Sequence, residues 1–337
     1  MLRTKFCDLF GIELPIMAAG MGTIALADLA AAVSEAGGMG TVALAVLTPE
    51  AMHNELAAAR KLTRRPLACN VLLPFLRSEV IEAVAAAPVE AVTLFWGKPS
   101  EHIPLFKSTG KKVIWQCGSA EEALAARRAG ADAIIAQGVE AGGHVRGVVT
   151  SLALIPQVRD AIGPDVPLVA AGGFADGRGL AAALALGADG AVFGTRFLAS
   201  VEAAAHPAYK QRILTARAED TVHTTLFDIG WPDAPHRVLR TAAYEEWERA
   251  GRPPSGQRPG EGTPIGEVKH AGMELPPPVK YTVMPPTEYV EGDLEQFAFY
   301  AGMSCALTNE ILPAGDIVRR IAAEAREVIA KRLAPLG

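Results

Sequence analysis

The residue best suited to chemistry is a histidine that ends a glycine-rich stretch, QGVEAGGH, at residues 137–144. An imidazole changes charge near neutral pH, so His144 could take up a proton or hydrogen-bond a reacting group. Single histidines are more often structural or solvated, but the flanking glycines and the position after an apolar run favour a catalytic role. We expect Glu140, in the same stretch, to orient the loop rather than to react.

Two further glycine-rich stretches predict a site for a phosphate group. AAGGFADG spans residues 170–177 and FGTR spans residues 193–196, and each follows an apolar run. Glycine lets the backbone approach an anion closely, and N–H groups at the start of a helix favour negative charge. The alternative is that these glycines only form tight turns. We favour a phosphate site because two such loops follow consecutive apolar runs. The residues predicted to bind the phosphate are Gly172, Gly173, Gly194 and Thr195.

Small residues and amides end three more apolar runs. The sequence MAAGM at residues 17–21 would let a flat ring lie against the backbone. Asn70 and Gln116 could contact the edge of such a ring through their side-chain amides. Taken singly, these features fit packing or loop anchoring equally well.

Eight short apolar runs are predicted to be the strands that position these residues. Continuous apolar runs are typical of parallel strands that are buried on both faces. Eight strand–helix units between about residues 14 and 200 favour a (β/α)₈ TIM barrel, an α/β fold, over a doubly wound sheet. In a TIM barrel the active site lies at the carboxyl ends of the strands, where each motif above falls. The predicted strands are Pro15–Ala18, Gly40–Ala43, Leu67–Val71, Ala91–Leu94, Lys112–Trp115, Ala133–Ala136, Pro167–Ala171 and Gly190–Phe193.

Residues that typically begin and end helices lie between these runs. Thr48 before Pro49 predicts the start of one helix, and Ser119 with Glu122 predicts a capping box at the start of another, which runs through Arg128. Glycines that follow alanine-rich stretches predict where helices end. These glycines are Gly37, Gly38, Gly130 and Gly187.

The pattern changes after residue 206. We expect residues 1–206 to form the barrel and residues 207–300 to form a smaller, mainly helical and irregular domain that covers the substrate. Residues 251–290 hold nine of the 24 prolines, which predicts a long irregular segment, either a lid or a packed loop. Residues 301–337 are expected to return to the barrel through a helix at Asp316–Leu333.

Composition and charge exclude several classes of function. The 337 residues are 50% hydrophobic, enough for a large core, and their formal net charge of −5 argues against nucleic acid or an anionic membrane as a partner. No signal-peptide pattern or long apolar run occurs, so we expect a cytoplasmic protein without a membrane partner. No metal-ligand spacing or G-x-S-x-G motif occurs, so no bound metal or nucleophilic serine is expected. The cysteines Cys7, Cys69, Cys117 and Cys305 lie far apart, which fits a reducing compartment.

The other histidines are expected to be structural or solvated. His53 and His102 fall in helical stretches and are predicted to be surface residues. The remaining four lie in the appended region, where a role in contacting the substrate is less favoured than a structural one. They are His206, His223, His236 and His270.

Together these motifs resemble the nitronate monooxygenase family, formerly called 2-nitropropane dioxygenases. This family lies in a superfamily of FMN-dependent TIM barrels that also includes the FabK-type enoyl-ACP reductases. The resemblance runs from about Phe10 to Ala199 and more loosely through the C-terminal helix. The matching segments are PIMAAGM at 15–21, Asn70, QGVEAGGH at 137–144, VAAGGFADGRGLAAALALGADG at 169–190 and FGTRFLAS at 193–200.

The resemblance implies FMN as the cofactor and places His144 as the active-site histidine near its reactive edge. It also implies that the FMN phosphate lies on the two glycine loops after the seventh and eighth strands. One departure follows His144, where Val145-Arg146-Gly147 stands in place of the shorter His-x-Gly step of many relatives. The residues implied to contact the flavin ring are Ala18, Ala19, Gly20, Met21, Asn70, Gln116, Gln137, Gly142 and Gly143.

The first functional hypothesis is oxidation of an alkyl nitronate or nitroalkane by dioxygen, giving a carbonyl compound and nitrite. His144 would hydrogen-bond the nitro oxygens or take the α-proton. The alternative is an NAD(P)H-dependent FMN reductase that acts on an enoyl thioester, such as enoyl-ACP, or on a quinone. A flavin-binding sensor is less favoured because His144 is present, and a homodimer is left open. Basic residues that could attract an acidic carrier protein are Lys210, Arg212, Arg217, Arg237 and Arg240.

Overall fold

Eight parallel strands form one closed sheet in the computed structural model, which describes residues 2–45, 47–269 and 277–336. The sheet order is β1-β9-β8-β6-β5-β4-β3-β2, and a parallel bridge between Met17 and Met39 joins β1 to β2. The predicted TIM barrel is therefore confirmed, and all eight predicted strands occur to within two residues at either end. Their bounds are β1 Ile16–Ala18, β2 Gly40–Ala43, β3 Leu67–Leu72, β4 Ala91–Phe95, β5 Lys112–Cys117, β6 Ala133–Gln137, β8 Leu168–Ala171 and β9 Gly190–Phe193.

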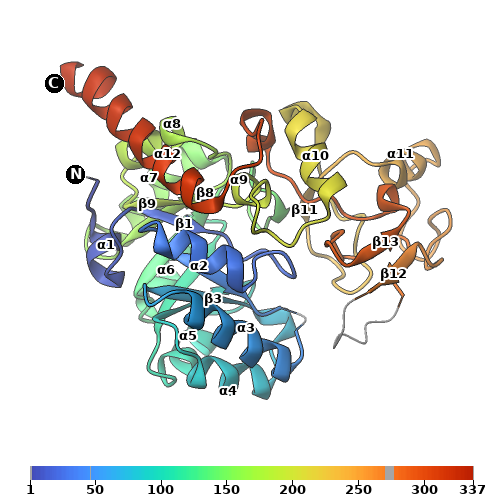
Figure 1. Cartoon of the computed structure of the whole chain (residues 1–337), viewed down its shortest axis with the longest axis horizontal. Helices are drawn as coiled ribbons and strands as arrows, with labels where there is room; N and C mark the ends of the chain where they lie inside the picture. Colours follow the sequence, from blue (N-terminus) through green and yellow to red (C-terminus); the bar gives the residue numbers. More distant parts are fainter. Residues whose placement is uncertain (1, 46, 270–276, 337) are drawn as a thin grey trace.

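Helices cover the outside of the barrel (Figure 1). Thr48 caps the second of them as predicted, and its side chain accepts a hydrogen bond from Ala51 N at 3.2 Å. Ser119 accepts from Glu122 N, but the Glu122 carboxylate accepts from Gly118 N, so only half of the predicted capping box forms. The helices are α2 Ala27–Glu35, α3 Pro49–Leu62, α4 Ser78–Ala86, α5 Pro99–Lys107, α6 Ala120–Arg128, α7 Ser151–Ile162, α8 Gly177–Ala185 and α9 Thr195–Leu198.

The interior of the barrel is filled by apolar side chains. Met17, Ile114 and Val169 belong to one buried cluster that also includes Phe6 and Phe10 of the first helix, α1 (Lys5–Phe10). Thr4, just before α1, donates to the carbonyl of Asp189, which precedes β9. Helix α1 therefore fills the N-terminal end of the barrel, and the carboxyl ends of the strands remain for the site.

The region after residue 206 lies beside the mouth of the barrel and contains more strand than predicted (Figure 1). One small sheet has the order β10-β11-β7, and its strand β7 is Gly143–His144 from the barrel loop itself. A second sheet pairs β12 with β13. The elements are α10 Pro207–Thr215, β10 Thr221–Thr224, β11 His236–Leu239, α11 Ala242–Arg249, β12 Gly266–Val268 and β13 Val290–Gly292.

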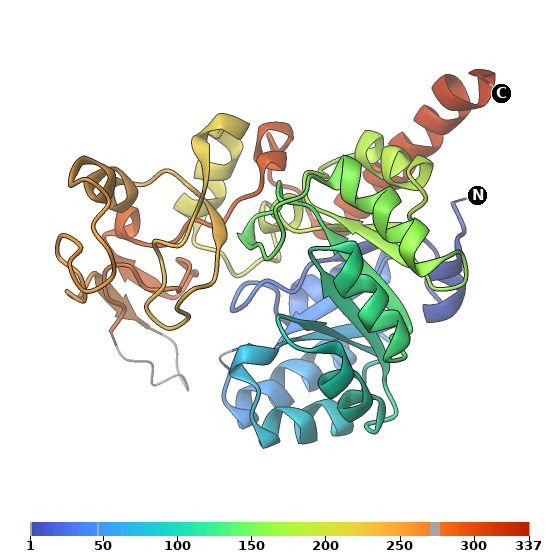
Figure 2. The same cartoon turned by 180° about the vertical axis from the view of Figure 1, so that it is seen from behind.

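The C-terminal helix returns to the barrel as predicted. Helix α12 spans Ala314–Val328, packs on α8 and α2, and continues as a π-helical turn over Ile329–Leu333. It lies on the side of the barrel away from the appended region (Figure 2). A separate apolar cluster that includes Leu226, Phe227 and Tyr281 lies wholly within residues 207–300. Other buried residues of this region, such as Tyr209 and Phe297, belong to the core cluster of the barrel, and the division at residues 206 and 300 stays a prediction.

No helix among the described residues is long and apolar enough to cross a membrane.

Candidate active site

A cavity of about 340 Å³ lies at the carboxyl ends of the barrel strands. Ala18 does not reach it, because this residue is fully buried inside β1 opposite Phe193. Residues of the appended region, among them Trp231 and Tyr300, complete the cavity wall. The predicted site residues that line the cavity are Ala19, Gly20, Met21, Asn70, Gln116, Gln137, Gly142, Gly143, His144, Gly172, Gly173, Gly194 and Thr195.

Three glycines lie where a side chain would collide with the protein. A Cβ atom on Gly20 would lie 2.3 Å from Asn70 Cβ, and one on Gly142 would lie 2.3 Å from Gly302 N. Gly172 has a φ of +96°, and a Cβ atom there would lie 2.8 Å from the Gly138 carbonyl oxygen. The lining is therefore bare backbone at these points, as close approach of a flat ring and an anion requires.

The two glycine loops after β8 and β9 differ in the helix that follows each. Asp176 caps α8, and its carboxylate accepts hydrogen bonds from Arg178 N and Gly179 N at 3.0 and 3.2 Å. This capping already uses two of the N–H groups with which α8 could hold an anion. An anion would be better placed at the bare backbone of Gly172–Gly173 and at the start of α9, Thr195.

The imidazole of His144 lies among aromatic rings at the cavity. It stacks on Trp231 with ring centres 4.0 Å apart, and Tyr300 and Trp96 approach at 5.5 and 6.1 Å. Within the described residues, the buried Nε2 atom of His144 has no hydrogen-bond partner. The same holds for Oε1 of Gln137, whose Nε2 donates to the His144 carbonyl at 3.1 Å. Both atoms are therefore available to hydrogen-bond a group that enters the cavity.

Burial keeps the histidine neutral. Desolvation, with a smaller contribution from nearby His236, lowers the pKa of His144 to about 3. Desolvation also lowers the pKa of His236 to about 4. His236 pairs with His144 across β11 and β7, and its ring centre lies 5.4 Å away. It contacts the site histidine but does not line the cavity, so the expectation that it would not touch the substrate fits the geometry.

These two pKa values predict that acid destabilises the protein. Both lie below the ordinary value of 6.5, so between about pH 6.5 and pH 4 the unfolded chain binds protons that the folded chain does not. The free energy of unfolding should therefore fall as the pH drops through 6.5, by up to about 1.4 kcal/mol per pH unit for each ring. Thermal unfolding midpoints of the holoprotein from pH 8 to pH 4.5 measure this slope.

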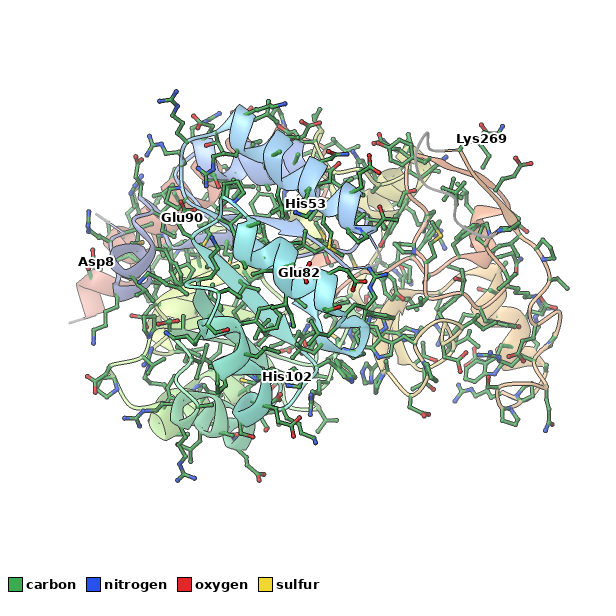
Figure 3. The ribbon with its side chains drawn as sticks, turned by 90° about the horizontal axis from the view of Figure 1, so that it is seen from below. Asp8, His53, Glu82, Glu90, His102 and Lys269 are labelled. Atoms are coloured by element: carbon green, nitrogen blue, oxygen red, sulfur yellow. The ribbon has the colours of Figure 1, made fainter. Side chains whose placement is uncertain are left out.

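The variant His236→Gln should make that slope shallower, because one of the two buried rings is removed. His53→Gln is the matched control, since His53 is exposed on α3. Figure 3 shows His53 and His102 on helices of the barrel, as predicted. An equal slope in the wild-type protein and in His236→Gln would contradict the burial effect.

The other histidines have separate places. His206 caps α10, and its Nδ1 accepts from Ala208 N at 3.1 Å. His223 is exposed on β10. His270 lies outside the described residues.

The three residues after His144 attach its loop to the rest of the molecule. Val145 is buried, and its N–H donates to the Pro235 carbonyl at 2.8 Å. The Arg146 guanidinium lies over the Trp96 ring at 5.8 Å and 3.6 Å from the Glu122 carboxylate. The departure noted in the sequence therefore fixes the loop on both sides.

Glu140 anchors the other end of the same loop. Its carboxylate accepts hydrogen bonds from Ser151 N and Ser151 Oγ, with distances between 2.9 and 3.0 Å. This arrangement matches the expected orienting role, since the carboxylate is already occupied at the start of α7.

The cations considered for an acidic carrier protein are mostly engaged elsewhere. Arg237 is buried and donates to the Val139 carbonyl. Arg217 pairs with Asp220, and Arg240 pairs with Glu248. Lys210 donates to the carbonyls of Ser200 and Val201, and Arg212 donates to that of Arg240. They do not form a free basic patch.

Aromatic residues of the lining are the part of the site that the sequence interpretation missed. Trp231, Tyr209 and Tyr300 come from the appended region, and Phe75 and Phe95 come from loops or strands of the barrel. The available signal was compositional. Aromatic residues make up only 6% of the chain, so a tryptophan in the irregular appended region was a candidate in its own right.

The cavity lining carries no formal charge. None of its described residues is Asp, Glu, Lys or Arg, and its histidine is held neutral. The part of this lining around His144, Trp231 and Tyr300 suits a neutral group with one or two hydrogen-bonding atoms.

Comparison with known proteins agrees with this architecture. The sequence model that represents the nitronate monooxygenase family matches residues 3–80 and 77–324 of this chain. The chain is 39% identical to the Mycobacterium tuberculosis (3aS,4S,5R,7aS)-5-hydroxy-7a-methyl-1-oxo-octahydro-1H-indene-4-carboxyl-CoA dehydrogenase, over 74% of this chain and 70% of the relative. It is 33% identical to a probable nitronate monooxygenase of Staphylococcus saprophyticus, over 67% of this chain and 76% of the relative.

A solved structure is similar over nearly the whole chain. FabK from Thermotoga maritima superposes with a TM-score of 0.80 at 34% identity, covering 99% of this chain and 100% of FabK. The family match thus includes the barrel, the glycine loops and the histidine loop. The protein belongs to the nitronate monooxygenase family and is a flavin-dependent oxidoreductase.

Proposed function

We propose that the protein is an FMN-dependent oxidoreductase that acts on an acyl thioester and exchanges electrons with a nicotinamide. The observation that carries this proposal is the uncharged cavity with a neutral His144 whose Nε2 atom is unpaired. A thioester is neutral at its reacting end and offers one carbonyl oxygen as a hydrogen-bond acceptor.

His144 would act as a hydrogen-bond donor. A neutral imidazole that carries its proton on Nε2 can donate to the thioester oxygen, where negative charge develops as the adjacent carbons react. Stacking on Trp231 fixes the plane of the ring, and pairing of β7 with β11 fixes its backbone. The low pKa keeps a second proton off the ring, so the donor is in one state over the physiological pH range.

FMN fits the residues around the cavity. Its flat ring would lie along Ala19–Met21, with Asn70, Gln116 and Gln137 at its edge and Gly142–Gly143 beside it. Its phosphate would be held by Gly172, Gly173, Gly194 and Thr195. The fit is supported by the bare backbone that Gly20, Gly142 and Gly172 present to the cavity and by Oε1 of Gln137, which has no partner among the described residues. When bound, FMN supplies two-electron redox chemistry.

The relatives support the substrate class. One is a dehydrogenase of a carboxyl-CoA compound, which is a thioester, and the similar solved structure is a FabK. Residues 207–300 would serve as the substrate-covering domain, since Trp231, Met284 and Tyr300 line the cavity.

Oxidation of a nitronate by dioxygen is the second candidate, because a relative of 33% identity is a probable nitronate monooxygenase. The cavity makes it less favoured for two reasons. A nitronate is an anion that would lie beside His144 and aromatic rings, where the described lining offers neither a cation nor the glycine-loop N–H groups proposed for the FMN phosphate. A neutral nitroalkane must lose its α-proton to a base, and the depressed pKa makes His144 a weak one.

Anaerobic half-reactions distinguish the two candidates. The flavin-loaded protein is mixed in separate experiments with NADH, NADPH and propyl nitronate, and bleaching of the flavin absorbance is followed. We expect a nicotinamide to bleach the flavin within seconds and crotonyl-CoA then to restore its colour in the absence of oxygen. Bleaching by the nitronate alone, with no response to either nicotinamide, would overturn the proposal in favour of nitronate oxidation.

A further inference from the structure

A second cavity, of about 300 Å³, adjoins the active-site cavity. It lies between the carboxyl ends of β2 and β3 and the helices α3 and α4. Three residues, Ala45, Leu72 and Phe75, line both cavities. The two cavities are therefore separated by no more than these side chains, and a ligand in the first would reach the second by passing Phe75.

The walls of the second cavity suit an alkyl chain. Leu44, Met52, Val71 and Val80 are nearly or fully buried, and each presents an apolar side chain. Its charged residue, Arg77, is exposed and donates to the Leu47 carbonyl at 3.0 Å. Apolar atoms make up the larger part of the accessible wall, so an alkyl chain would leave water for a mainly apolar surface.

Phe75 connects this cavity to the reacting end of the substrate. Its ring contacts the Trp231 ring edge to face at 5.1 Å, and Trp231 stacks on His144. Phe75 is half-buried at the end of a short 3-10 turn, Leu73–Phe75. The ring of Trp231 thus lies between His144 and Phe75. A substrate whose carbonyl lies at His144 would therefore have Phe75, part of the wall shared by the two cavities, beyond Trp231.

We propose that the second cavity binds the apolar acyl tail of the thioester substrate. The inference rests on the proposed function, and it adds that the substrate has an alkyl or alicyclic acyl group well beyond four carbons. Each buried methylene should tighten binding roughly fourfold, which corresponds to about 0.8 kcal/mol. If the acyl chain occupied only the first cavity, further carbons would not tighten binding.

The test compares binding of two saturated thioesters to the flavin-loaded protein. Butyryl-CoA and octanoyl-CoA are titrated while the flavin spectrum is recorded, so no turnover is needed. We expect octanoyl-CoA to bind at least tenfold more tightly than butyryl-CoA. Binding of 1-octanol, followed by tryptophan fluorescence, probes the apolar cavity without a thioester.

Two substitutions fill the second cavity from different walls. Leu76→Trp adds bulk at a half-buried position, and Val80→Phe adds it at a buried one on α4. Each should remove most of the preference for octanoyl-CoA and change the affinity for butyryl-CoA by less than twofold. The matched control is Ala85→Phe, which adds the same ring on an exposed position of α4 and should keep the preference.

The outcomes separate the two proposals. Equal affinity of the wild-type protein for both thioesters, or a preference that survives in both filled variants, overturns the tail site. If neither thioester binds but 1-octanol does, and the filled variants lose it, the thioester function is overturned and the apolar ligand site stands. If no probe binds, both proposals are overturned.

Discussion

The variant His144→Ala should retain its flavin and lose at least about a hundredfold in turnover, the effect typical of removing one donor aimed at developing charge. The ring lies at the cavity with a free Nε2 atom, while the predicted phosphate and ring contacts come from other residues. The ratio of flavin to protein absorbance measures cofactor content, and steady-state assays with the best electron donor and acceptor from the half-reactions measure turnover.

The form of the pH profile tests the role of that ring. If neutral His144 donates a hydrogen bond, the ring should not titrate between pH 6 and pH 8. A break in the wild-type kcat profile in this range that is absent from His144→Asn would contradict this role. His144→Asn keeps an N–H donor and should recover part of the activity lost in His144→Ala. Full activity of the alanine variant would exclude a catalytic His144.

The variant Gly172→Val is expected to bind FMN at least about tenfold more weakly than the wild-type protein and to lose flavin during purification, because the strain and clash would together cost more than about 1.4 kcal/mol. A Cβ atom there would lie 2.8 Å from the Gly138 carbonyl, and the φ of +96° is one that valine resists. The change therefore moves the loop that we propose to hold the phosphate. Flavin content after purification and after dialysis against excess FMN checks the result.

A second glycine separates the collision from the backbone strain. Gly130 has a similar φ of +91°, but a Cβ atom there would meet nothing within 4 Å. Gly130→Val should thus lower the thermal unfolding midpoint yet keep its flavin. Equal loss of flavin in both variants would mean that global destabilisation, and not the phosphate loop, explains the result.

The barrel could be predicted because its strands are buried on both faces. Runs such as Ala133–Ala136 and Pro167–Ala171 are continuously apolar, and this pattern does not depend on the residues that pack against them. The glycines between a helix and the next strand, such as Gly37 and Gly130, adopt positive φ values as helix ends require. Local signals and burial therefore agreed throughout the first 200 or so residues.

The barrel side of the site could be predicted for a related reason. In this fold a residue that follows a strand lies at the mouth, so position along the chain was sufficient to bring Asn70, Gln137 and His144 to one cavity. The predicted site began one residue too early, at Ala18, which still belongs to β1 and is buried there. The cavity lining begins at Ala19.

The appended region could not be predicted in the same way. Its two small sheets have strands of three or four residues, too short for a periodic pattern, and one pairs with a two-residue strand of the barrel loop. Trp231, which precedes β11 in the chain, stacks on His144, and burial keeps that ring neutral. Neither can be inferred from residue types alone.

The pairing of β7 with β11 also sets the order in which the protein can become active. During synthesis the barrel strands and their glycine loops leave the ribosome before β11, Trp231 and Tyr300 exist. A nascent chain could hold the cofactor while His144 still lacked the strand and rings that fix it. We expect such a chain to hold its cofactor without turning over the thioester, so that turnover begins only once the translated chain has passed Tyr300.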